Sequence, residues 1–139
     1  MRRFIIFTAL TASATAVFAA VAWAGSPHFI DNSLSVTRSG DSLIVSGKEA
    51  GLGDEAQIEV LVTASAACIN PGDNHPKAAN KETFSAEGQF PVQNGKAEFS
   101  LTLVATLQPS CSPPMSIQWS DVTVTDLTNG ISASFSGTF

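Results

Sequence analysis

Apolar and polar residues alternate along three long stretches of the chain, Gln57–Cys68, Lys96–Ala105 and Ile131–Phe139. A period of two is typical of a β-strand that buries one face, because successive side chains point to opposite sides of the sheet. We therefore expect three half-buried strands. The residues expected to face the core are Ile58, Val60, Val62, Ala64, Ala66 and Cys68 in the first, Ala97, Phe99, Leu101, Leu103 and Ala105 in the second, and Ile131, Ala133, Phe135, Gly137 and Phe139 in the third.

A fourth stretch, Ser116–Asp126, alternates with a change of phase. Its apolar positions begin at Ile117 and Trp119 and continue at Val122 and Val124, so one step is three residues instead of two. A β-bulge near Ser120 would restore the apolar side chains to one face. A strand that serves two sheets would also explain the shift. We expect Trp119 to lie in the core.

Shorter alternating runs predict three further strands, Ser33–Arg38, Ser42–Gly47 and Thr83–Val92. Glycine-containing turn signals separate the runs. The pair Asn94-Gly95 is a strong hairpin signal, since both central residues of a type I′ turn need positive φ.

Seven candidate strands with this spacing, and no helical periodicity after residue 25, predict an all-β fold. We expect an immunoglobulin-like β-sandwich of about seven antiparallel strands, formed as one domain by residues 25–139.

The first 24 residues have the pattern of a secretory signal peptide. Arg2 and Arg3 precede an apolar stretch from Phe4 to Ala20, and Ala22-Trp23-Ala24 places small residues before the expected cleavage site. A retained membrane helix is disfavoured, because the stretch is only weakly hydrophobic. Export by the general secretory route is favoured over the twin-arginine route. The protein is therefore expected outside the cytoplasm, as a secreted extracellular protein or as one that is periplasmic or associated with the cell wall.

The two cysteines of an exported chain predict one disulfide, Cys68–Cys111. It would close a loop of about 44 residues and contribute roughly 4 kcal/mol to stability. Cys111 lies in the Pro/Ser-rich stretch "LQPSCSPPMS". We therefore expect the bridge at one end of the sandwich instead of across its core.

The net charge narrows the choice of partners. The sequence has seven basic and twelve acidic residues. Removal of the expected signal peptide takes away Arg2 and Arg3, so five basic residues remain and the net charge of the mature chain is −7. An acidic surface repels phosphate backbones, so nucleic acid is not an expected partner. No later apolar run approaches the length of a membrane-spanning helix. We expect a monomer.

The polar segment between Cys68 and Phe84 is the strongest candidate for a binding site. It forms a loop from Ile69 to Glu82, which is long for a connection between strands. A loop held by a disulfide can present hydrogen-bonding side chains to a sugar or protein partner. The candidate binding residues are Asn70, Asp73, Asn74, His75 and Lys77.

Metal binding and catalysis find little support in the residues. A calcium site from Asn70, Asp73 and Asn74 would hold one charged ligand, and zinc would rest on His75 alone. No metal or cofactor is therefore expected. The chain contains no G-x-S-x-G, H-E-x-x-H, C-x-x-C or P-loop motif. We expect no catalytic residues and no enzyme activity.

Two stretches, "KEAGLG" at Lys48–Gly53 and "ACINPGDNHPKAANKE" at Ala67–Glu82, together with "SPHFI" at Ser26–Ile30, resemble an uncharacterised group of small secreted proteins of mostly actinobacterial origin. That resemblance implies export and a compact β-fold, and it implies no site residues. The pattern V-S-G-x-x-x-G-L at Val45–Leu52 more loosely resembles bacterial immunoglobulin-like domains, including neocarzinostatin-type apoproteins, and implies the same fold.

These observations together predict a secreted, non-catalytic module that binds a protein or carbohydrate surface through the loops at the disulfide-pinned end. Three alternatives stay open. They are a structural component of an extracellular coat or matrix, an enzyme of unrecognised type, and a small outer-membrane barrel. The barrel is disfavoured by the absence of tyrosine and by several short strands.

Overall fold

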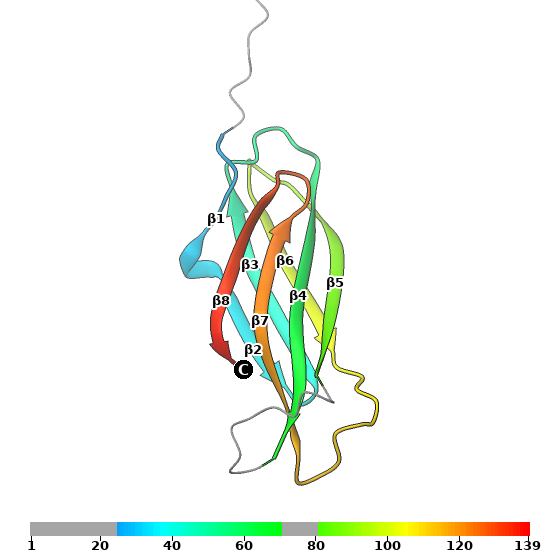
Figure 1. Ribbon diagram of the computed structural model, residues 1–139. Coiled ribbons are helices and arrows are strands. Elements are labelled where there is room, and N and C mark those ends of the chain that lie inside the picture. Colours follow the sequence, from blue (N-terminus) through cyan, green and yellow to red (C-terminus); the bar gives the residue numbers. More distant parts are fainter. Residues whose placement is uncertain (1–24, 71–80) are drawn as a thin grey trace, which may run out of the picture.

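A computed structural model describes residues 25–70 and 81–139 of the chain. Two antiparallel sheets pack face to face, with the strands running along the long axis (Figure 1). The elements are β1 (His28–Phe29), the 3₁₀ turn η1 (Asp31–Ser33), β2 (Ser35–Ser39), β3 (Ser42–Ala50), β4 (Gln57–Ile69), β5 (Lys81–Pro91), β6 (Ala97–Val104), β7 (Ser116–Asp126) and β8 (Ile131–Thr138). The expected signal peptide lies outside the described residues.

Sheet A contains β1, β2, β3 and β6, and sheet B has the order β5-β4-β7-β8. In sheet A, β6 pairs along one side of β3. Both β1 and β2 pair with the other side, with η1 between them. Strands β2, β3 and β6 of sheet A face strands β4, β7 and β8 of sheet B. When β2 is counted as the first strand, these are the first, second and fifth strands facing the third, sixth and seventh, which is the arrangement in immunoglobulin domains. The all-β sandwich predicted from the alternation is confirmed, with β5 beside β4 instead of beside β6.

The core lies between the sheets and is built mainly from the alternating positions identified in the sequence. The expected inward residues of β8 are only half-buried, and Gly137, which was expected to face the core, is exposed because it lies at a register shift. All six inward positions of β4 are buried, and Trp119 is fully buried. The ring of Phe84 meets the Trp119 indole edge-on at 5.7 Å. The Trp119 Nε1 has no hydrogen-bond acceptor among the described residues.

The change of phase in β7 is a β-bulge. Thr63 of β4 pairs with Thr123, whereas Ser65 pairs with Ser120, so β7 has one extra residue at this point. Asp121 takes the extra position with φ of 53°, a left-handed conformation that aspartate tolerates better than most residues. The alternative of a strand shared between sheets is wrong, because among the described strands β7 pairs only with β4 and β8, both in sheet B.

The turn at Asn94-Gly95 has the predicted geometry but joins the two sheets. Both residues have positive φ, 53° and 72°, and Gln93 and Lys96 exchange backbone hydrogen bonds across them. The strands on either side of this turn belong to different sheets, β5 before it to sheet B and β6 after it to sheet A. A hairpin was expected across this turn, but only the residues next to it, Gln93 and Lys96, pair with each other.

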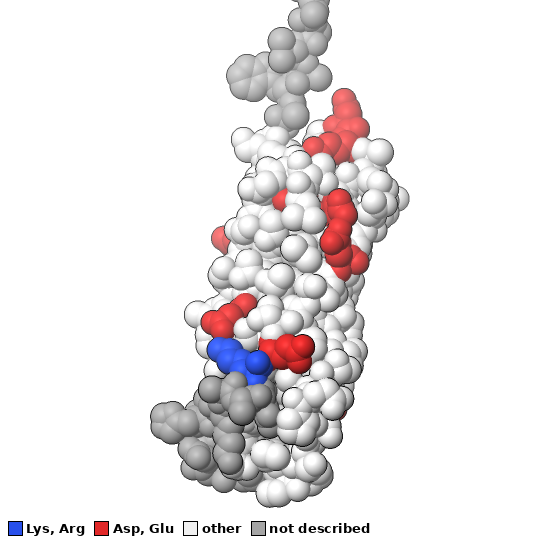
Figure 2. All heavy atoms as spheres, turned by 45° about the vertical axis from the view of Figure 1, so that its right-hand side comes forward, with Lys and Arg blue, Asp and Glu red and all other residues white. Residues whose placement is uncertain are grey.

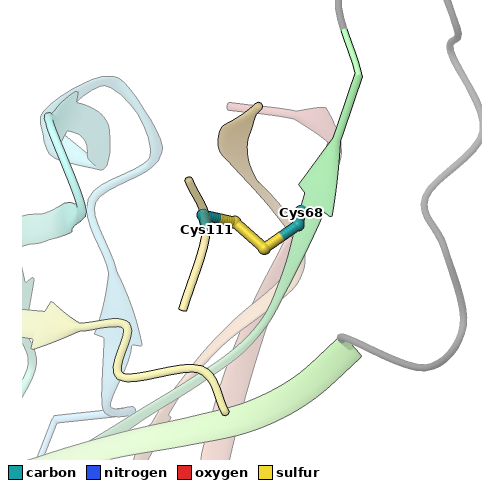
Figure 3. Close-up of a disulfide and its surroundings, with 2 residues drawn as sticks. All are labelled: Cys68 and Cys111. Atoms are coloured by element: carbon teal, nitrogen blue, oxygen red, sulfur yellow. A yellow bond between two sulfur atoms is a disulfide. The ribbon is translucent and has the colours of Figure 1, made fainter. Parts of the chain in front are cut away.

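The sandwich has two distinct ends. At the disulfide end, the last inward residue of β4 is bonded to the β6–β7 connection through Cys68–Cys111, with a Cα–Cα distance of 5.7 Å (Figure 3). The predicted bridge and its position are thus confirmed. At the turn end lie the β3–β4 connection, the β5–β6 turn and the β7–β8 turn (Figure 1). Within residues 25–70 and 81–139, no helix is long and apolar enough to cross a membrane.

Candidate functional site

The loop predicted as a binding site lies between β4 and β5 at the disulfide end. Its expected bounds of Ile69 and Glu82 were wrong, because Ile69 pairs within β4 and Lys81 and Glu82 pair within β5. Asn70 is half-buried directly after β4. The other four candidates, Asp73, Asn74, His75 and Lys77, lie outside the described residues. The loop site therefore stays a prediction, while the disulfide that anchors it is present.

No group of three or more His, Cys, Asp or Glu side chains in the described parts of the chain is placed to hold a metal ion. His28 is exposed, and its Nδ1 lies 2.9 Å from the carbonyl oxygen of Ser26. Both cysteines are in the disulfide, so neither offers a thiolate.

A groove crosses sheet A near the turn end, and we call it the sheet A groove. Its main part has a volume of about 780 Å³. It lies between η1 on one side and the β5–β6 turn on the other, with β3 and the start of β6 between them. Its lining residues are Ile30, Asn32, Ser33, Lys48, Pro91, Gln93, Lys96, Ala97 and Glu98.

A second hollow of about 510 Å³ adjoins the main part of the groove. The two share Ser33, Lys48 and Glu98. Phe90 and Phe99 line the second hollow only, and their rings meet edge-on at 6.2 Å. The combined surface therefore offers amide, hydroxyl and ammonium groups beside aromatic carbon.

The position of η1 is fixed by hydrogen bonds to β3. The Ser33 hydroxyl donates to the carbonyl oxygen of Ile30 at 2.6 Å, and it accepts from the Lys48 backbone N–H at 2.8 Å. The Ile30 backbone N–H donates to the Lys48 carbonyl oxygen at 2.9 Å. One wall of the groove is thus attached to the strand that forms its floor.

Most of the described basic residues belong to sheet A or its adjoining turns. Of the four described basic residues, Arg38, Lys48 and Lys96 belong to sheet A or its adjoining turn, and only Lys81 belongs to sheet B. Figure 2 shows acidic atoms spread along the side on which β5 lies, with basic atoms at one place only. Lys48 forms an ion pair with Glu98 at 3.1 Å.

A pair of buried carboxyl groups lies inside the turn end, and the sequence analysis did not single them out. Glu49 of β3 and Asp126 of β7 are both 0% exposed. The two strands belong to different sheets. The side chains are within hydrogen-bonding reach of each other, so the contact joins sheet A to sheet B.

Asp126 accepts hydrogen bonds from the β7–β8 turn. The backbone N–H of Thr128 donates to its Oδ1 at 2.8 Å, and the Asn129 side-chain amide donates to its Oδ2 at 2.6 Å. The same Asn129 amide donates to Glu55 at 3.1 Å. Asp126 therefore accepts hydrogen bonds from the backbone and from a side chain of this turn.

Glu49 has the opposite surroundings. No described N–H or O–H group reaches either of its carboxyl oxygens. Burial raises the pKa of Glu49 to about 8, and the hydrogen bond to Asp126 and the negative charges of Asp126 and Glu55 act in the same direction. At neutral pH the raised pKa leaves the Glu49 carboxyl group mostly protonated and uncharged.

A second carboxyl pair lies on the surface of sheet B. The hydrogen bond to Glu87 and then the charge of Glu87 raise the pKa of Glu59. The carboxyl group of Glu59 is solvent-exposed, so water and salt screen this pair.

Comparisons of the chain with protein-family models, with curated proteins and with solved structures give no match. The likenesses to secreted actinobacterial proteins and to neocarzinostatin-type domains therefore stay predictions.

Proposed function

We propose that the protein is an exported, non-catalytic binding module that holds a saccharide in the sheet A groove. The groove itself is the observation that carries this proposal. It is the larger of the two hollows described above, and it is lined by hydrogen-bonding side chains that come from separate parts of the chain.

The chemistry of the lining supports a saccharide ligand. Asn32 and Gln93 offer amide donors and acceptors on opposite walls, and Lys96 adds an ammonium group. Ile30 and Pro91 supply apolar surface. A sugar ring has hydroxyl groups at its rim and C–H groups on its faces, so it uses both kinds of surface. Sites of this kind combine apolar walls with a few placed polar groups.

The construction of the groove favours binding over catalysis. Its one acidic side chain, Glu98, is 76% exposed and ion-paired with Lys48, and no second carboxylate or histidine lines the groove. Acid–base catalysis on a glycosidic bond ordinarily uses two carboxyl groups on either side of that bond. The two fully buried acids, Glu49 and Asp126, are not among the lining residues.

The experiment is a binding screen against soluble glycans and cell-wall polysaccharides, followed by calorimetry on the best ligand. The groove variant carries Asn32→Ala, Gln93→Ala and Lys96→Ala. Three lost hydrogen bonds at about 1 kcal/mol each predict a Kd that is weaker by roughly a hundredfold. A matched control carries Gln57→Ala, Gln89→Ala and Lys81→Ala on sheet B, which removes two amides and one lysine elsewhere.

A third variant, with Asn74→Ala, His75→Ala and Lys77→Ala, tests the loop predicted from the sequence. Binding lost only in the groove variant supports the groove as the site. Binding lost only in the loop variant moves the same function to the disulfide end. No binding to any glycan by the unchanged protein contradicts the proposal.

A further inference from the structure

We propose that Glu49 and Asp126 form a proton-dependent clasp between the two sheets, closed while one proton lies between the carboxyl groups and loosened when that proton is lost. The clasp is independent of the groove proposed above, and it would act whatever the protein binds.

The placement of the two residues makes the contact a bridge across the sandwich. Glu49 lies near the end of β3, paired with Phe29 of β1 and Ala97 of β6. Asp126 ends β7, paired with Val60 of β4 and Ile131 of β8. All four paired neighbours are apolar, so the strands on either side bring no charge to the carboxyl groups.

The remaining charged group is also acidic. Glu55, in the β3–β4 connection, raises the pKa of Glu49 by its negative charge. Asn129 is neutral and hydrogen-bonds to both Asp126 and Glu55. No described Lys, Arg or His side chain forms an ion pair with Glu49, Asp126 or Glu55. Because no cationic side chain pairs with these carboxyl groups, it is a bound proton that removes the repulsion between the two buried groups.

The chemistry of the pair explains why the clasp is strong only in one protonation state. A carboxylic acid donating to a carboxylate forms a charge-assisted hydrogen bond. Two ionised carboxylates in the same dry site repel each other, and neither can supply a donor. Loss of the proton thus converts the contact between Glu49 and Asp126 into a repulsion.

The direction of the pH dependence follows from the pKa of Glu49, which folding raises from 4.5 to about 8. Below pH 4.5 both the folded and the unfolded chain hold the proton. Between pH 4.5 and about 8 only the folded chain holds it, so stability falls as pH rises. The equilibrium constant for local opening of the turn end is expected to rise by up to tenfold per pH unit in this interval, and to level off above it.

The test measures hydrogen exchange of backbone amides at pH 6, 7, 8 and 9, corrected for the intrinsic exchange rate. The reporters at the turn end are the N–H groups of Thr128 and Gly130, which bond to Asp126. The reporter at the disulfide end is the N–H of Ala105, which bonds to Asp41 at 3.0 Å. We expect protection at the turn end to fall by up to tenfold per pH unit between pH 6 and 8 and to level off between pH 8 and 9, and we expect it to stay constant at the disulfide end.

The variant Glu49→Gln keeps a donor to Asp126 but cannot titrate, so its turn-end protection is expected to be independent of pH. Glu55→Gln is the matched control, and it should keep the transition with a lower midpoint. An unchanged pH dependence in Glu49→Gln would overturn the clasp, as would equal loosening of both ends in the unchanged protein.

Two further measurements keep the proposal testable if Glu49→Gln does not fold. Carbon-13 NMR of the unchanged protein should show the Glu49 carboxyl titrating near pH 8, and titration near pH 4.5 would contradict the clasp. Calcium added at pH 9 should leave turn-end protection low. Restored protection would overturn the proposal, since a cation would then replace the proton.

Discussion

The disulfide end and the turn end of the sandwich each carry one contact that ties distant parts of the chain together, and the two contacts differ in kind. At the disulfide end a covalent bond joins Cys68 of β4 to Cys111. At the turn end a shared proton joins Glu49 of β3 to Asp126 of β7. The first depends on the redox state of the surroundings and the second on their pH.

The two contacts also act on different states of the chain. In the chain-entropy account, a disulfide stabilises mainly by restricting the unfolded ensemble. The carboxyl pair acts through the folded state alone, because only folding brings the two groups together. The two contributions can therefore be separated by changing one condition at a time.

The largest effect is expected from removing the covalent contact. Cys68→Ala combined with Cys111→Ala should lower the free energy of unfolding by about 4 kcal/mol, the chain-entropy value for a loop of this length. Urea unfolding at pH 6 measures the loss, and a reducing agent added to the unchanged protein should reproduce it. A loss below about 1 kcal/mol would show that the disulfide end holds without its bond.

The next largest effect is expected at the opposite end. Asp126→Ala leaves Glu49 buried without its acceptor and frees the N–H groups of Thr128 and Asn129, so a loss of about 3 kcal/mol is expected. Asp54→Ala, an exposed acid of the same end, serves as the control. If the two variants were equally stable to urea at pH 6, the contacts of Asp126 would not stabilise the turn end.

Two glycines allow the ends to be compared through the backbone. Gly51 has φ of 75°, and a Cβ there would strike the Ser26 carbonyl group, whereas Gly40 has φ of 58° and open space around it. Both alanine variants carry the left-handed penalty of about 1 kcal/mol, and only Gly51→Ala should add a steric loss of about 1–2 kcal/mol. Thermal unfolding of the two variants measures the difference. Similar melting temperatures would mean that the segment before β1 does not pack tightly at the turn end.

The smallest effect is expected from the exposed carboxyl pair. Folding raises the pKa of Glu59, so the folded chain also prefers the protonated form here, and stability should fall slightly as pH rises through that group's titration. Glu59→Gln should remove this slope, and 1 M salt should remove it in the unchanged protein as well. The buried pair should resist the same salt. If 1 M salt also removed the pH dependence of stability that is due to Glu49, the burial of Glu49 would be contradicted.

Alternation in the sequence was sufficient to predict most of the fold. The strand Ser116–Asp126 has its predicted bounds, and its change of phase correctly indicated a bulge. The predicted strand Ser33–Arg38 was wrong at its start, because the short turn η1 precedes β2 there. Ser33 was expected in a strand but lies in η1, whose position depends on hydrogen bonds to Lys48, fifteen residues away.

The buried acids could have been found from the same alternation. Leu43, Val45 and Gly47 face the core in β3, and the next inward position is Glu49. Asp126 likewise follows Val122 and Val124. The strand was expected to end at Gly47, two residues before Glu49, whereas β3 continues to Ala50. The groove could not be predicted, because its walls come from η1 and the β5–β6 turn, and no local pattern relates them.

The bulge in β7 has a consequence for self-association. β8 is the outermost strand of sheet B, and its sequence ISASFSGT contains no charged residue and no proline. Such strands invite the addition of another chain and lead to aggregation. β5, at the other side of the sheet, carries Lys81, Glu82, Glu87 and Pro91, all of which discourage it. On β8 the register shift opposite Asp121, with Gly137 at φ of 99°, breaks the regular spacing of its free hydrogen-bonding groups. This irregularity limits how far a second chain could pair with β8.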